Sequence, residues 1–324
     1  GEQLMQTPLG WIASKVEFGP TAMRRAAIGS VVVTMAIVVG GAVVRVTGSG
    51  LGCPTWPSCV DGSLGPTPEM GIHGLIEFGN RLLTWVLCIA VGVVIVVAKC
   101  QRPLRRDVLR MAWVQFWIVV LNAIVGGLTV LARLSPYMVA AHFIAAMLLL
   151  TAAVRTYDLV EKRADTTSSA VSNMRLQVLG RVLLGATAAL VLLGTVVTGT
   201  GVHAGDSADV HRIPLDWTVM TLVHGTAAAV VTVLVGVLFL RVRNVGAPQL
   251  ARSASLFVVL LLAQGAIGLL QALGVTPETL IVLHLLGSSL IWAGVLRILF
   301  EINRMEAYGR INEPRPAGEL PAIR

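Results

Sequence analysis

Charged residues are scarce in this chain. Only 13% of its 324 residues are Asp, Glu, Lys or Arg, whereas 55% are hydrophobic. A water-soluble fold cannot cover that much apolar surface with so few polar groups, so the composition excludes a soluble protein. Alternation of apolar and polar residues is missing as well. Runs such as VVLLLAQGAIGLL (258–270) therefore exclude a transmembrane β-barrel.

Long apolar runs are what the chain does have. Eight of them are each long enough to cross roughly 30 Å of hydrocarbon as a helix. They cover residues 24–46, 74–98, 109–132, 136–157, 175–199, 217–240, 253–273 and 279–303. The sequence therefore predicts an all-α polytopic membrane protein with eight transmembrane helices. The first 22 residues lack the charged, apolar and small-residue order of a cleaved signal, so we expect the first span to stay as an anchor.

The few charges are placed unevenly along the spans. Of the 25 Lys and Arg residues, four (Arg45, Arg81, Arg133 and Arg212) lie on one predicted side of the membrane and the other 21 on the opposite side. The positive-inside rule makes the crowded side cytoplasmic, which predicts a cell-membrane protein with both termini in the cytoplasm. The net charge of +8 is then explained by the membrane topology and by attraction to anionic lipid. We therefore predict no nucleic-acid partner.

Cysteines are few, and two of the four share one loop. Cys53 and Cys59 lie in the stretch GSGLGCPTWPSC (48–59), which the charge pattern places outside the cell. Disulfides persist on the oxidising side of a membrane, so we expect these two residues to pair. The pair can be a structural staple or a redox-active relay of electrons, and both interpretations stay open. Two thiols without a neighbouring pair of ligands do not make a zinc site.

The two halves of the chain resemble each other. GAVVRVTG (41–48) matches GTVVTGTG (194–201), and the stretch that ends at His142 matches the one that ends at His284. This repeat predicts two pseudo-symmetric four-helix bundles. The predicted segments are a cytoplasmic N-terminal segment at 1–23, an N-terminal bundle at 24–157, a cytoplasmic linker at 158–174, a C-terminal bundle at 175–303 and a cytoplasmic tail at 304–324.

Three histidines lie inside predicted spans, each within about two turns of the outer end. Ionisable side chains at that depth are costly unless they find partners, so His142, His224 and His284 are candidate functional residues. For any single one, a plain interhelical hydrogen bond is the alternative. His224 and His284 come from alternate helices of one bundle and can hold a flat haem from both faces. We therefore predict a bis-histidine b-type haem in the C-terminal half.

The N-terminal half carries a different set of polar residues at the same depth. The repeat places His142 and Asn80 where the other half has its two histidines. Asparagine is a poor iron ligand, so one axial face of a haem bound here would stay open. Glu77 lies about one turn before Asn80 and is either paired, with Arg81 as the candidate partner, or kept near neutral for proton transfer. One half is thus predicted to transfer electrons and the other to perform chemistry.

With these residues in place, the chain resembles the haem A synthase family, membrane enzymes that oxidise a methyl group of haem O to the formyl group of haem A. The resemblance covers nearly the whole chain. It rests on the eight spans, the outer-loop pattern T-G-S-G-L-x-C-P-x-W-P-x-C, the I-E-F-x-N-R segment of the second span and the histidines of spans four, six and eight.

The resemblance implies a role for each candidate residue. Two successive hydroxylations would give a gem-diol that loses water to the aldehyde, while the protein holds the porphyrin, feeds in electrons and moves protons. The implied roles are haem b on His224 and His284, substrate haem O near His142, Asn80 and the catalytic Glu77, propionates on Arg81 or Arg45, and the Cys53–Cys59 pair beside the substrate.

The chain departs from the family pattern at two places. The family commonly has His where this chain has Asn80, and His73, a little under two turns earlier, is the candidate substitute if the helix is shifted. Many members also carry a second cysteine pair before the sixth span. This chain has His203 and His211 there, which are either solvent-facing loop residues or contacts to a haem edge or a metal.

The resemblance leaves several partners and two rival functions open. A haem O synthase and an electron donor, either a quinol or a reductase, are the expected partners, and an oligomer is not excluded. A b-type cytochrome that passes electrons from quinol would need two comparable haem sites, which the contrast of Asn80 with His224 argues against. A proton-coupled transporter predicts helices broken at mid-membrane, whereas the polar residues here cluster near the outer face.

Overall fold

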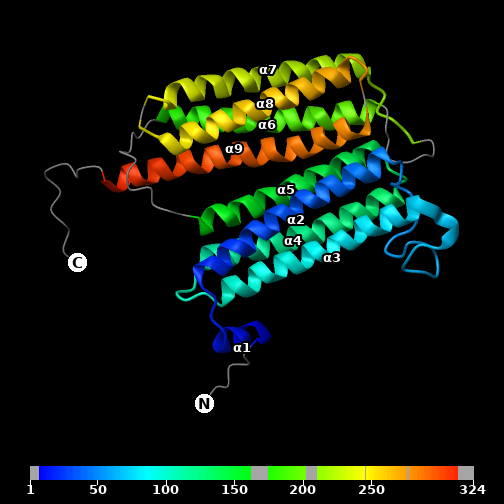
Figure 1. The fold of residues 1–324 in the computed structure, drawn as a ribbon, viewed down its shortest axis with the longest axis horizontal. Coiled ribbons are helices and arrows are strands. Elements are labelled where there is room, and N and C mark those ends of the chain that lie inside the picture. The colour runs from blue at the N-terminus through cyan, green and yellow to red at the C-terminus, as the bar shows by residue number, and fades with distance from the viewer. Residues whose placement is uncertain (1–6, 162–173, 202–209, 245, 276, 313–324) are drawn as a thin grey trace.

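The computed structural model describes residues 7–161, 174–201, 210–244, 246–275 and 277–312 (Figure 1). Within these ranges the chain forms nine α-helices and one short 3₁₀ turn, η1. The elements are α1 (Pro8–Lys15), α2 (Pro20–Val46), η1 (Pro68–Met70), α3 (Gly71–Lys99), α4 (Arg106–Leu131), α5 (Pro136–Val160), α6 (Met174–Thr200), α7 (Trp217–Val242), α8 (Pro248–Ala272) and α9 (Glu278–Asn312).

Eight of these helices, α2 to α9, are long and apolar enough to cross a membrane, which confirms the predicted fold class. Their ends follow local sequence signals. Proline occupies the first turn of α2, α5 and α8, where its missing N–H costs no hydrogen bond. The carboxylate of Asp216 caps α7 by accepting the N–H of Val219 at 2.8 Å. Helix α1 was not predicted, and α9 continues beyond the predicted span end at residue 303.

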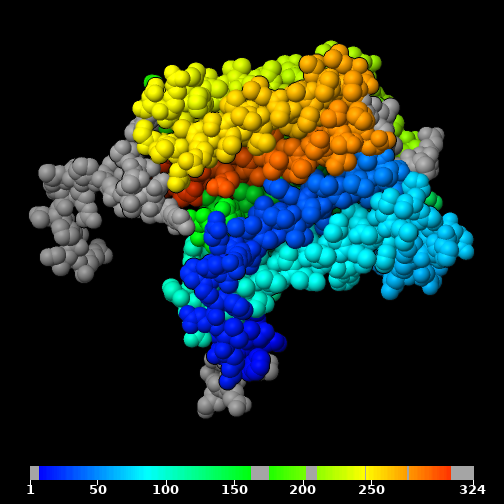
Figure 2. Space-filling view, viewed as in Figure 1, coloured from blue at the N-terminus to red at the C-terminus, as the bar shows by residue number. Residues whose placement is uncertain are grey.

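The helices form two four-helix bundles that lie side by side (Figures 1 and 2). In the N-terminal bundle each of α2 to α5 packs on the next, and α5 packs back on α2. In the C-terminal bundle α6 to α9 repeat this order, with α9 back on α6. The residue bounds predicted for the two halves stay predictions, and residues 162–173 of the predicted linker lie outside the described residues.

The two bundles meet along α2, α5, α6 and α9. A small apolar cluster bridges them, in which Val38 and Leu150 pack with Leu296. Polar contacts cross the same interface as well. The indole Nε1 of Trp292 donates a hydrogen bond to Oγ1 of Thr151 at 2.8 Å, and Arg304 of α9 forms an ion pair with Asp158 of α5. Trp292 is partly buried, and the bond from its indole N–H orients α9 against α5.

One end of the molecule gathers the functional candidates, and we call it the loop end. There α2, α4, α6 and α8 end and α3, α5, α7 and α9 begin, and residues 47–67, which we call the disulfide loop, project from it (Figures 1 and 2). Packing in the C-terminal bundle is densest away from this end. All buried residues of α7 lie at or beyond Val231, and all those of α8 lie at or before Leu261. The parts of α7 and α8 nearest the loop end therefore bury no residue.

Candidate functional site

The three intramembrane histidines share one packing arrangement at the loop end. Each imidazole lies against a glycine of the preceding helix, and a Cβ placed on that glycine would come within van der Waals distance of the ring. The pairs are Gly126 with His142, Gly194 with His224 and Gly268 with His284, and the Cβ would lie 3.2, 3.2 and 3.5 Å from ring carbon Cε1. Glycine lets the two backbones approach closely, so the imidazoles are held in the bundle interior.

Asn80 occupies the fourth position of this arrangement. A Cβ placed on Gly40 of α2 would lie 2.7 Å from Asn80 Oδ1 on α3. This contact agrees with the internal repeat, in which Asn80 occupies the position that corresponds to His224. The contacting glycine lies one residue before the one that the sequence match indicated. That match paired Gly41 with Gly194, whereas a Cβ on Gly41 would meet no atom within 4 Å. Adjacent glycines look equivalent in a sequence but lie on different faces of a helix.

The C-terminal pair consists of His224 on α7 and His284 on α9. The two side chains are close enough to interact electrostatically. Nδ1 of each ring is buried, and neither has a hydrogen-bond partner among the described residues. The main chain at this point is well held, since Nε2 of Gln264 and Oγ of Ser288 each donate to the carbonyl of His284 at 2.9 Å.

These observations test whether a haem fits the C-terminal bundle. A buried imidazole nitrogen without a partner costs free energy, so such a position favours a ligand that takes the lone pair. Two imidazoles from one bundle, in a segment where α7 and α8 bury no residue, suit a flat porphyrin with an axial ligand on each face. The residues present therefore fit a haem.

Glu77 and Asn80 lie one turn apart on α3, in the N-terminal bundle. The carboxylate of Glu77 is buried and pairs with Arg81, whose Nε lies 3.3 Å from Oε1. The paired alternative predicted for Glu77 is thus the one found. Oδ1 of Asn80 is buried without a hydrogen-bond partner in the described part of the chain. His142 on α5 completes the set, so this bundle offers one imidazole, one amide and one carboxylate.

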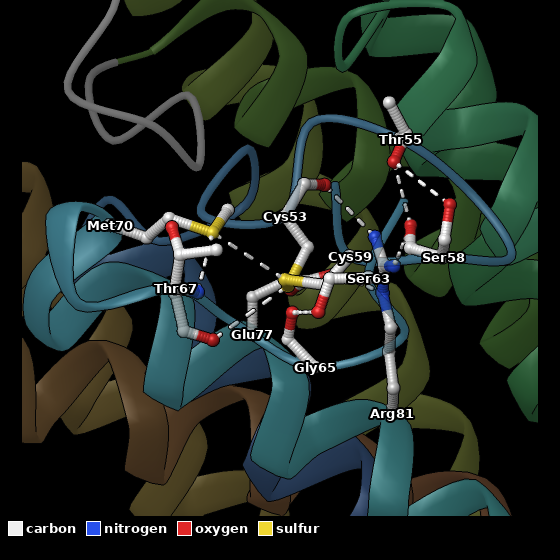
Figure 3. Close-up of a disulfide and its surroundings, with 11 residues drawn as sticks. Cys53, Thr55, Ser58, Cys59, Ser63, Gly65, Thr67, Met70, Glu77 and Arg81 are labelled. Carbon is white, nitrogen blue, oxygen red and sulfur yellow. Dashed lines mark hydrogen bonds and ion pairs between the residues drawn. A yellow bond between two sulfur atoms is a disulfide. The ribbon is translucent and has the colours of Figure 1, made fainter. Parts of the chain in front are cut away.

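The structure pairs Cys53 with Cys59, as the sequence predicted. The two Cα atoms are 4.4 Å apart, and both cysteine side chains, which belong to the disulfide loop, are fully buried (Figure 3). Between them, Trp56 reaches across to α4, where a Cβ on Gly127 would lie 2.4 Å from the indole ring. Only glycine leaves room for that ring. The disulfide loop therefore covers the loop end of the N-terminal bundle from α3 to α4.

His73 and Arg81 hold the disulfide loop on α3. Nδ1 of His73 shares a hydrogen bond with Oγ of Ser49 at 2.8 Å, which ties it to the loop. The role of His73 as a substitute haem ligand stays a prediction. Arg81 donates to two loop carbonyls, from Nη2 to Cys53 at 2.9 Å and from Nη1 to Ser58 at 3.2 Å. Sequence reasoning expected Arg81 to contact a propionate and missed these bonds.

Two cations gather at the junction of the bundles. Arg45, at the end of α2, interacts electrostatically with Arg212 and with His284, so it lies beside the C-terminal site although it belongs to the N-terminal half. Arg212 donates to the carbonyl of Thr198, and burial lowers the pKa of its guanidinium. Arg212 was not a predicted site residue, but as one of only four Lys and Arg residues on its predicted side of the membrane it could have been noticed.

The two remaining histidines of the predicted set lie in the α6–α7 connection. His211 is exposed, as expected for a solvent-facing loop residue. His203 falls outside the described residues.

Comparison with known proteins gives a family match over most of the chain. Residues 24–296 match the family model described as cytochrome oxidase assembly protein. Curated relatives include three proteins named "Heme A synthase". That of Lysinibacillus sphaericus is 35% identical over 142 residues, 41% of this chain and 45% of the relative. That of Geobacillus thermodenitrificans is 31% identical over 147 residues (43% and 44%), and that of Listeria welshimeri 33% over 114 residues (35% and 37%). The chain thus spans less than half the length of the curated relatives it matches.

Proposed function

We propose that this chain, which belongs to the cytochrome oxidase assembly protein family, is a haem A synthase. Such an enzyme is a membrane oxidoreductase that oxidises a methyl group of haem O to the formyl group of haem A. One observation carries the proposal. Two bundles of the same architecture hold different side chains in matching positions, two histidines in one and a histidine with an asparagine in the other.

We assign haem b to the C-terminal bundle, with His224 and His284 as its axial ligands. The haem supplies one-electron transfer when it is bound. The protein presents the two imidazoles from facing helices, against Gly194 and Gly268, and keeps their Nδ1 atoms away from competing hydrogen-bond donors in the described residues. Arg45 adds a positive charge beside His284, suited to a propionate carboxylate.

We assign the substrate, haem O, to the N-terminal bundle. His142 would hold the porphyrin from one face, and Asn80 would leave the opposite face without a second histidine. Glu77 is the catalytic residue of the proposal. Its buried carboxylate can accept a proton at Oε1 or Oε2 and release it as the methyl group is oxidised in two successive hydroxylations. The disulfide loop would exclude bulk water from this space.

The setting of the enzyme follows from its spans. The chain is a multi-pass membrane protein. We propose that it lies in the cell membrane with both termini in the cytoplasm, because 21 of its 25 Lys and Arg residues lie away from the loop end. Its proposed partners are haem O, membrane lipid, a haem O synthase and an electron donor, either a quinol or a reductase.

The test is the haem content of the purified protein. A reduced-minus-oxidised visible spectrum, combined with pyridine-haemochrome analysis of the extracted haems, is expected to reveal haem b together with haem O or haem A. Haem b alone would favour a plain b-type cytochrome. A colourless preparation would overturn the assignment of haem to either bundle and favour a transporter.

A further inference from the structure

We infer that Arg81 is a positioning residue that couples the disulfide loop to the Glu77 carboxylate, so that loop and carboxylate form one unit. The inference rests on the proposed function only for what Glu77 does. Its geometric basis is independent of any haem. The guanidinium of Arg81 donates from Nε to Glu77, from Nη2 to the carbonyl of Cys53 and from Nη1 to the carbonyl of Ser58 (Figure 3).

The two loop carbonyls flank the disulfide. One belongs to Cys53 itself and the other to Ser58, the neighbour of Cys59. The bond between the cysteines closes this short segment into a ring, so both carbonyls stay directed at the same guanidinium. Without that bond the segment would have to lose backbone entropy before it could present both acceptors at once.

Arginine is suited to this task because its planar group carries five N–H donors in a fixed geometry. The long side chain of Arg81 has many rotamers, and ordering it costs conformational entropy. The two loop carbonyls hold it in one of them. Arg81 then fixes Glu77, one turn earlier on α3, through the 3.3 Å contact between Nε and Oε1. Both side chains are largely shielded, with 16% and 8% of their surface exposed, so solvent competes weakly for these bonds.

The C-terminal bundle lacks this arrangement at the corresponding positions of α7. Gly225 follows His224 where Arg81 follows Asn80, and Thr221 lies three residues before His224 where Glu77 lies three before Asn80. The coupled set thus accompanies the bundle to which the chemistry is assigned.

Susceptibility of the disulfide to a dithiol tests the coupling without any activity measurement. Dithiothreitol transfers two electrons and two protons to the Cys53–Cys59 bond, which becomes two thiols while the reagent forms its own disulfide. The full-length protein in detergent is treated with dithiothreitol, and free thiols are alkylated and counted by mass spectrometry. R81Q should be reduced faster than wild type by roughly tenfold or more, because the loop loses charged hydrogen bonds. E77Q should also be reduced faster, by a smaller factor, because Arg81 loses the carboxylate that helps to fix its side chain.

The matched control is S63A, since the hydroxyl of Ser63 donates within the loop, to the carbonyl of Gly65 at 2.9 Å. Its reduction rate should stay at the wild-type value. R81K retains the charge but cannot make three directed bonds, so it should lie between wild type and R81Q and also serves if R81Q does not fold. Reduction of E77Q at the wild-type rate would overturn the coupling, as would equal rates for R81Q and S63A.

Oxidation of haem O provides the second readout. R81Q and C53S/C59S should each lower kcat by roughly tenfold to a hundredfold, and the triple variant should be no slower than the slower of the two, because both changes break one unit. Effects that multiply in the triple variant would show that loop and arginine act independently. If wild-type protein held no haem, the proposed function would fail, while the reduction rates would still decide whether Arg81 couples the loop to Glu77.

Discussion

The two bundles place polar side chains at two matching positions and differ in which residue occupies one of them. In the C-terminal bundle the positions on α7 and α9 hold His224 and His284. In the N-terminal bundle the matching positions hold Asn80 and His142. On the proposed assignment, one exchange of an imidazole for an amide separates a haem site with two histidine ligands from one with a single histidine ligand. The comparison indicates that the shared helices set the depth and spacing of the polar side chains, while the identity of single residues sets what each bundle can bind.

The bundles are not independent of each other. Arg45 belongs to the N-terminal half by sequence but interacts electrostatically with His284 of the other half. The N-terminal bundle in turn has a cover of its own, the disulfide loop with its contacts to Arg81 and Gly127. The two bundles thus share their order of helix contacts, and the features that lie outside the repeat distinguish them.

The largest expected effect is loss of haem b. His224→Ala or His284→Ala should each abolish the low-spin b-haem signal in the reduced visible spectrum, because one axial ligand is removed. His142→Ala is the matched variant of the other bundle and should leave that signal intact. A full haem b spectrum in both C-terminal variants would contradict the ligand assignment.

Glu77→Gln should separate chemistry from electron transfer. The amide keeps the shape of the side chain but cannot accept a proton, so haem A formation should fall by about a hundredfold or more while haem b stays in place. Extracted haems are separated by liquid chromatography to measure the product. Thr221→Val, at the corresponding position of α7, is the control and should form haem A normally. An unchanged yield in Glu77→Gln would remove this residue from the mechanism.

Asn80→His should make the N-terminal site resemble the C-terminal one. Gly40 leaves room beside residue 80 much as Gly194 does beside His224. With a second imidazole available, substrate haem should become low-spin, and oxidation should slow by roughly tenfold because the open face is closed. Electron paramagnetic resonance of the ferric protein measures the spin state. The opposite exchange, His224→Asn, should remove a low-spin signal. An unaltered spectrum in Asn80→His would disprove that Asn80 faces the haem.

The glycine contacts should give the smallest effects, graded by distance. Gly127→Ala places a Cβ 2.4 Å from the Trp56 ring and must displace it, which should cost about 1–3 kcal/mol of stability. Gly268→Ala meets His284 at 3.5 Å, an ordinary contact, and should be nearly neutral. Thermal unfolding in detergent compares the two variants. Equal unfolding temperatures would mean that Trp56 does not rest on α4 in the protein.

Much of the framework could be predicted because its causes are local. Each apolar run is long enough to span the bilayer by itself, so the eight helices follow from composition and length. Cys53 and Cys59 are close in sequence and can pair without help from distant segments. The contrast between Asn80 and His224 was likewise visible, because a repeat compares positions directly. Helix α1 was missed, since an eight-residue segment carries little periodic signal.

Other contacts depended on segments that are distant in the sequence. Arg81 could be expected to pair with Glu77, four residues away on the same helix, but its bonds to the carbonyls of Cys53 and Ser58 required the loop to fold back on α3. Every residue has a backbone carbonyl, so residue identities do not indicate which carbonyls will accept a hydrogen bond from Arg81. Two other contacts also join segments that are distant in the sequence. They are the contact of Trp56 with Gly127 and the position of Arg45 near His284.

The sequence by itself determined how many helices cross the membrane, which residues are costly to bury there and how the two halves correspond, because hydrophobic transfer free energy depends on composition and length. Only the tertiary structure decided which glycine faces Asn80, which site receives Arg45 and what Arg81 holds. These outcomes depend on helix rotation and side-chain direction, where a shift of one residue turns a side chain by about 100°.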